Sequence, residues 1–149
     1  MPLTIQHADH HYFSKSNDLL PDALLQLFII PNLKFEIDEF TEFLPCLQFE
    51  SSHGLHHLVL WTARLMHYSF YVMNFNRQGM FLDMSEIAGF YSDSNLVVQK
   101  MAHVDVEGNL FIVEGSINEN HHDVNPLTTK KWQLEILPDG LLRTTQIKL

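Results

Sequence analysis

The chain has 149 residues and a formal net charge of −9, since 18 Asp and Glu outnumber 9 Lys and Arg. With 46% hydrophobic and 18% charged residues it is too apolar for a disordered chain, and its acidity disfavours nucleic acid as a partner. A single cysteine, Cys46, excludes an internal disulfide. The sequence opens with no leader-like pattern and has no apolar run of ~18 residues. We therefore expect a cytoplasmic protein without a membrane span.

The first third of the sequence differs in pattern from the rest. No linker or repeat divides the chain, so we expect one domain over residues 1–149, in which a helical or irregular segment, 1–45, covers a β-barrel, 46–149. Asn17-Asp18 predicts the N-cap of a short amphipathic helix over Leu19–Ile30, which Pro31 ends.

From Cys46 onward, short β-branched and aromatic runs alternate with turn residues, a pattern typical of an antiparallel meander. The breaks fall at residues 52–54, 76–79, 92–95, 107–109 and 138–140. Eight or nine strands with short loops favour a closed barrel or a strongly curled sheet, because closure removes exposed strand edges.

The last hairpin supplies one candidate for ligand binding. A tight turn at Asp139-Gly140 pairs Ile136 with Arg143 and places Arg143 on the face that carries Trp132. Because a guanidinium is always charged, an inward-facing Arg143 predicts an acidic group on a bound molecule. The alternative is an arginine that reaches solvent or pairs with a structural acid.

The preceding hairpin, which turns near Gly108, supplies candidates for catalysis. Its pattern places His103 opposite Glu114 or Ile112, depending on the turn, and Ala102 on the other face. A His–carboxylate pair can move a proton near neutral pH, so His103 and Glu114 are the predicted catalytic residues. The alternative is a solvent-facing cross-strand pair.

The hairpin around residues 76–79 is apolar on both faces, so it needs cover on both sides. The cover could be a ligand inside a barrel, the N-terminal helix or a second subunit of a homodimer. Aromatic and methionine side chains shape apolar ligand sites and ordinary cores alike. On the ligand interpretation the binding candidates, besides Arg143, are Trp61, Tyr71, Met73, Met101 and Trp132.

Ten histidines form clusters that suggest metal binding. The pattern His-x-x-His-His begins at His7 and again at His53, and His121-His122 precedes Asp123. Neutral imidazoles at such spacings can bind Zn²⁺, but the signature zinc spacings are absent. We expect neither a metal nor a cofactor.

The stretches 109–115 and 125–143 resemble the closing strands of calycin-type barrels, the group of lipocalins and fatty-acid-binding proteins. In that group an arginine on the final strand often points inward, which Arg143 matches. The resemblance covers the last third of the chain, and no Gly-x-Trp opens a first strand. The stretch Trp132–Leu149 is also similar to the end of the NTF2-like cone, an α+β fold that begins with helices.

Three functions follow from this interpretation. The first is binding of a small apolar or aromatic, acid-bearing molecule in a barrel cavity lined by Arg143. The second is a cofactor-free isomerase, cyclase or lyase that uses a His–carboxylate pair in the same cavity. The third is a protein-interaction module without a small-molecule site, which predicts that the Met73–Met84 face is exposed or lies in a dimer interface.

Overall fold

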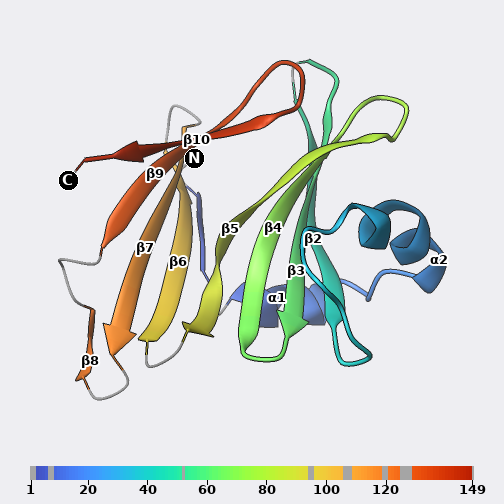
Figure 1. The fold of residues 1–149 in the computed structure, drawn as a ribbon. Coiled ribbons are helices and arrows are strands. Elements are labelled where there is room, and N and C mark those ends of the chain that lie inside the picture. The colour runs from blue at the N-terminus through green and yellow to red at the C-terminus, as the bar shows by residue number, and fades with distance from the viewer. Residues whose placement is uncertain are drawn as a thin grey trace.

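The computed structural model describes residues 3–6, 9–51, 53–93, 96–105, 109–118, 121–124 and 129–148. They form a ten-stranded sheet whose neighbouring strands are antiparallel, with a few short helices (Figure 1). The mainly β, antiparallel prediction is confirmed. In chain order the elements are β1 (Leu3–Ile5), α1 (His10–Ser16), α2 (Asp22–Leu24), η2 (Leu25–Ile29), η3 (Ile30–Asn32), β2 (Glu42–Glu50), β3 (His56–Arg64), β4 (His67–Phe75), β5 (Phe81–Asp93), β6 (Leu96–Val104), β7 (Leu110–Asn118), β8 (His121–Val124), β9 (Lys130–Ile136) and β10 (Leu142–Ile147).

The predicted closed barrel is wrong. The strands run in the order β10-β9-β7-β6-β5-β4-β3-β2, with β1 on β6 and β8 on β7, so β2 and β10 are opposite edges that do not pair (Figure 1). The edge strand β2 carries Pro45, which lacks a backbone N–H, and its register with β3 shifts between Pro45 and Leu47. Such irregularities protect an open edge against pairing with another chain, so this edge does not depend on closure.

The sheet forks between β5 and β6. These strands pair only from Asp93–Leu96 to Gly89–Lys100, and beyond that point β1 pairs with β6, with Ile5 opposite Ala102. Gly89 has φ +147°, and an added Cβ would lie 2.3 Å from the Tyr68 carbonyl oxygen, so a side chain at this position would collide with the backbone of β4. The fork separates β6–β10 from β2–β5.

The N-terminal segment contains two helical stretches. The structure adds α1, which the sequence pattern did not predict, and the expected helix over Leu19–Ile30 begins at Asp22, directly after Pro21. Asn17 does not cap that helix. It ends α1, and its side-chain amide donates to the carbonyl oxygens of Pro45 and Cys46 at 2.8 and 3.1 Å, which fixes α1 to β2. The sheet also extends into this segment, because β1 and the start of β2 precede residue 46.

Strands β3–β5 are buried on both sides, as predicted for the 76–79 hairpin. Figure 1 shows α1 behind β3 and β4, and α2 to the right, beside β2. The first core includes Phe13 of α1, and its other members include Trp61, Phe70, Val72, Ile87, Ile112 and Leu134. The second core includes Ile29 of η2, and its other members are Phe43, Leu60, Tyr71, Met73 and Met84. The N-terminal segment therefore covers the Met73–Met84 face.

The predicted register of the last hairpin is wrong by one residue. Leu142, not Arg143, lies opposite Ile136, and Arg143 lies opposite Glu135. The loop is longer than a two-residue turn, because the Leu137 N–H donates to the Leu141 carbonyl oxygen at 2.9 Å. Since side chains alternate along a strand, a shift of one residue moves Arg143 to the opposite face.

The predicted pairing of the β6–β7 hairpin is also wrong. His103 lies opposite Phe111, and Ala102 lies opposite Ile112. Glu114 lies opposite Lys100, on the face that does not carry His103.

Candidate functional site

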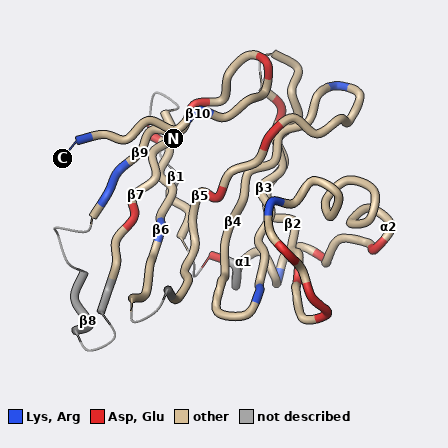
Figure 2. The backbone as a smooth tube through the Cα atoms, viewed as in Figure 1, with Lys and Arg blue, Asp and Glu red and all other residues tan. Residues whose placement is uncertain are grey.

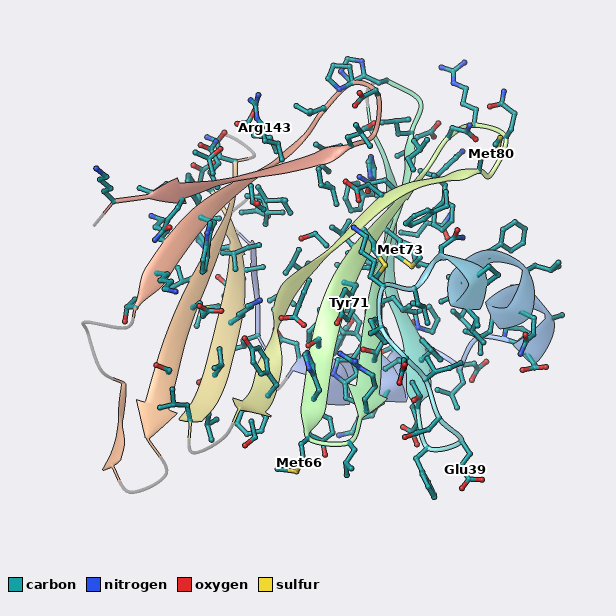
Figure 3. All side chains as sticks on the ribbon, in the orientation of Figure 1. Glu39, Met66, Tyr71, Met73, Met80 and Arg143 are labelled. Carbon is teal, nitrogen blue, oxygen red and sulfur yellow. The ribbon has the colours of Figure 1, made fainter. Side chains whose placement is uncertain are left out.

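The Arg143 side chain is exposed and does not face inward. Its guanidinium nitrogen lies 2.8 Å from Glu135 Oε2, and 59% of its side chain is exposed. Figure 3 shows it on β10, well away from Tyr71 and Met73 on β4. The alternative interpretation, an arginine paired with a structural acid, describes this geometry, and the inward-facing expectation is wrong.

His103 and Glu114 do not form the predicted pair. His103 Nδ1 lies 3.0 Å from the Thr4 hydroxyl, which links β6 to β1. Glu114 Oε1 lies 3.8 Å from Lys100 Nζ. The two residues face opposite sides of the sheet, so their side chains do not share a proton.

The structure divides the other predicted ligand-binding residues between different places. Tyr71 and Met73 belong to the core beneath the N-terminal segment, whereas Trp61 and Trp132 belong to or pack on the other core. Met101 is half-buried and lies opposite Val113. These residues do not line one common cavity.

No metal site is found among the described side chains. No three His, Cys, Asp or Glu residues come together there in a group that could hold an ion. The side chains of His7, His10 and His11, and those of residues 121–123, lie outside the described part of the structure.

An apolar groove lies between the N-terminal segment and strands β2–β4. The groove has a volume of about 280 Å³. Ile29 is buried against the sheet, which holds η2 in place, whereas Leu24 and Phe28 stay 42% exposed at the groove. The apolar lining residues are Leu20, Leu24, Phe28, Ile29, Leu58 and Phe75.

A few polar residues border the same groove. Gln48 of β2 lies opposite Leu58, and His56 lies opposite Phe75, so these four side chains share one side of the sheet. None of the described residues that line the groove is Lys or Arg. Figure 2 likewise shows an acidic residue and no basic residue on α2 and η2. The groove offers hydrogen-bonding groups but no fixed positive charge.

Sequence reasoning missed Glu86 of β5, a carboxylate with four polar partners among the described side chains. Its Oε2 lies 2.7 Å from His67 Nε2, 2.8 Å from Ser69 Oγ and 3.2 Å from the Tyr71 hydroxyl oxygen. Its Oε1 lies 2.8 Å from Lys100 Nζ. The signal in the sequence is the alternation of His67, Ser69 and Tyr71, which places three polar groups on one face of the strand.

The Glu86 carboxylate is fixed in its charged form. Burial alone would raise its pKa, but the hydrogen bond from His67, the charge of Lys100 and the hydrogen bond from Ser69 outweigh burial and lower the pKa to about 2. Burial would lower the pKa of Lys100, but the charge of Glu86 raises it above its usual value. Burial and the nearby Glu86 charge raise the pKa of Tyr71. Glu86 and Lys100 therefore hold their charges near neutral pH and do not exchange protons.

A second buried polar group joins the two parts of the sheet. Asn74 Nδ2 donates to the Gly140 carbonyl oxygen at 2.9 Å, so Asn74 Oδ1 accepts from His57 Nδ1 at 2.7 Å. His57 and Asn74 are both fully buried. Asp83 of β5 adds to the contact by accepting from the Leu142 N–H at 2.9 Å. These bonds hold the β9–β10 hairpin on β3–β5.

Comparison of the chain with protein-family models, curated proteins and solved structures found no match. None of the described helices has the length and hydrophobicity needed to cross a membrane.

Proposed function

We propose that the protein binds a small, uncharged, apolar molecule in the groove between η2 and strands β2–β4. The observation that carries the proposal is the groove itself, a concave space of about 280 Å³ with mostly apolar walls and three polar residues, Gln48, His56 and His57, in its lining. Small-molecule sites in proteins have this composition, in which apolar walls supply affinity and a few polar groups orient the guest.

A bound molecule would bury the exposed apolar surface of two side chains in the groove. Leu24 and Phe28 are each 42% exposed, and complete burial of such side chains contributes about 1.5–3 kcal/mol apiece. Covering the exposed part of both contributes on the order of 2 kcal/mol. The N-terminal segment is anchored by Ile29, so the groove exists before the guest arrives.

The groove favours an uncharged guest over the acid-bearing one that the sequence predicts. The expected partner of an acid was Arg143, which is exposed and paired with Glu135. Since no Lys or Arg is among the described residues lining the groove, a buried acid there would lose its water without gaining a counter-charge.

The Met73–Met84 face, which the interaction-module hypothesis predicts to be exposed or in a dimer interface, is covered by the chain itself. Met73 is fully buried and Met84 is 4% exposed, because the N-terminal segment lies over them. A small guest in the groove needs no exposed Met73–Met84 face, so this observation favours ligand binding.

A fluorescence titration tests the proposal with two probes that share one ring system. N-phenyl-1-naphthylamine is neutral, whereas 1-anilinonaphthalene-8-sulfonate carries a sulfonate. We expect saturable binding of the neutral probe, with at least tenfold lower affinity for the sulfonate. Absence of saturable binding of the neutral probe, or tighter binding of the sulfonate, would contradict the proposal.

Two leucines of the same segment provide a matched pair of variants. Leu24→Ser changes a residue that lines the groove, and Leu27→Ser changes one that does not and is 68% exposed. We expect Leu24→Ser to weaken binding of the neutral probe about tenfold and Leu27→Ser to leave it unchanged, with circular dichroism confirming that both fold. Equal weakening by both would show that the probe binds elsewhere.

A further inference from the structure

A second, polar cavity lies at the fork of the sheet. Its volume is about 220 Å³. The two strands that diverge there carry Glu86 and Lys100. Lys100 belongs to the last β5–β6 pair, Gly89–Lys100, and Glu86 lies just past that pair on β5. The residues that line it are Ser85, Glu86, Lys100, Ile112, Trp132 and Thr144.

The charged groups of this cavity are fixed rather than reactive. Both Glu86 oxygens already accept hydrogen bonds, and Lys100 is held between Glu86 and Glu114. A carboxylate that stays ionised is a poor proton donor, and a lysine that stays protonated is not a nucleophile. The cavity is therefore suited to holding a molecule, not to proton transfer or covalent chemistry by these two groups.

The lining identifies the chemical class of the molecule. An ammonium group has three N–H donors, and Lys100 lies within hydrogen-bond distance of only one carboxylate, since Glu114 is 3.8 Å away. The hydroxyls of Ser85 and Thr144 can both donate and accept. Trp132 and Ile112 add an aromatic and an aliphatic side chain to the lining.

The charges that line the cavity disfavour a charged guest. Glu86 and Lys100 sum to zero, so a small anion finds no excess positive charge. The Glu86 carboxylate that a cation would need is already paired with Lys100. A neutral molecule with several hydroxyls and an apolar carbon skeleton satisfies both halves of the lining. We propose that this cavity binds a small neutral polyhydroxylated molecule of about monosaccharide size. The proposal does not depend on the function proposed for the apolar groove.

Saturation-transfer difference NMR tests this with defined probes: D-glucose, D-galactose and myo-inositol as neutral polyols, and sodium phosphate as the anion. We expect saturable binding of at least one polyol in the millimolar range and no displacement of that polyol by phosphate. Absence of saturable binding for all three polyols, or competition by phosphate at equal concentration, would overturn the proposal.

Neighbouring threonines on β10 supply the control. Thr144→Leu fills the cavity from its exposed rim, whereas Thr145→Leu makes the same change at the next residue, which does not line it. We expect at least tenfold weaker polyol binding for Thr144→Leu, unchanged binding for Thr145→Leu, and unchanged binding of N-phenyl-1-naphthylamine by both. Equal effects of the two variants on polyol binding would place the polyol outside the cavity. If the wild-type protein does not bind N-phenyl-1-naphthylamine, only the function proposed for the apolar groove is refuted.

Discussion

Glu86→Gln is the sharpest test of how the sheet is held together at its fork. The substitution keeps the shape of the side chain but removes the charge that His67, Ser69, Tyr71 and Lys100 converge on. The Glu86 side chain is only 14% exposed, so solvent screens these contacts little. Removing one partner of a buried ion pair leaves the other charge without compensation, which costs more than the loss of a surface pair.

The pKa of Glu86 sets the magnitude. It falls from the ordinary 4.5 to about 2, and at about 1.36 kcal/mol per pKa unit this corresponds to about 3 kcal/mol of folding stability. Because the folded-state pKa is the lower one, this contribution is complete well above pH 4.5 and is lost as the pH falls towards 2. At pH 3 less than half of this contribution remains.

Urea denaturation of the wild type and Glu86→Gln from pH 7 to pH 3 measures this. We expect Glu86→Gln to be less stable by about 3 kcal/mol at pH 7, and the difference to shrink by more than half at pH 3. Glu135→Gln is the matched control, since Glu135 pairs with Arg143 at the surface and contributes less than about 1 kcal/mol. A difference that is the same at both pH values, or equal for the two variants, would refute the assignment of this stability to the ionised Glu86.

Three further predictions follow from buried groups and one turn. Asn74→Ala leaves His57 Nδ1 and the Gly140 carbonyl oxygen unpaired. We therefore expect the free energy of unfolding, measured by urea denaturation, to fall by about 3 kcal/mol and amide hydrogen exchange in β10 to become faster. Unchanged exchange in β10 would show that Asn74 does not hold the hairpin. Gly140 has φ +87° and an added Cβ would lie 2.3 Å from Leu82 Cδ1, so Gly140→Ala should lower stability by about 1–2 kcal/mol, and an unchanged melting temperature would contradict this. Burial raises the pKa of Cys46 to about 12, although a backbone hydrogen bond at Trp61 partly offsets this effect. We therefore expect no reaction of Cys46 with Ellman's reagent at pH 8 until urea unfolds the protein. Rapid reaction of the folded protein would refute this.

Local patterns predicted the elements of this fold better than their pairing. The turn at Asp139-Gly140 is present, and the apolar hairpin around 76–79 is covered on both sides. The register of the last hairpin failed because the loop closes through Leu137 and Leu141 instead of a two-residue turn. One additional residue in the loop changes which face carries Arg143, so the predicted ligand-binding role of Arg143 depended on the exact length of this loop.

The Glu86 cluster could not be predicted from sequence because its geometry depends on a local irregularity. The register of β4 with β5 shifts between Phe70 and Tyr71, since Phe70 lies opposite Ala88 and Tyr71 opposite Glu86. Ile87 is therefore an extra residue in β5, and such a bulge redirects the neighbouring side chains. Periodicity alone cannot place a bulge, although three polar groups on alternate residues of β4 indicated that this face needs a polar partner.

The same carboxylate also stabilises the contact between the N-terminal segment and the sheet. The Tyr71 hydroxyl donates to Glu86 and accepts from Arg64 at 3.3 Å. The Arg64 guanidinium lies 3.9 Å from the centre of the Phe35 ring, and Phe35 packs against Tyr71 with 5.2 Å between ring centres. Phe35 follows η3, so the segment that forms the wall of the apolar groove is held to the sheet partly through Glu86. The polar cavity and the apolar groove thus have separate linings, and contacts through Tyr71, Arg64 and Phe35 connect Glu86 to the segment that forms the groove wall.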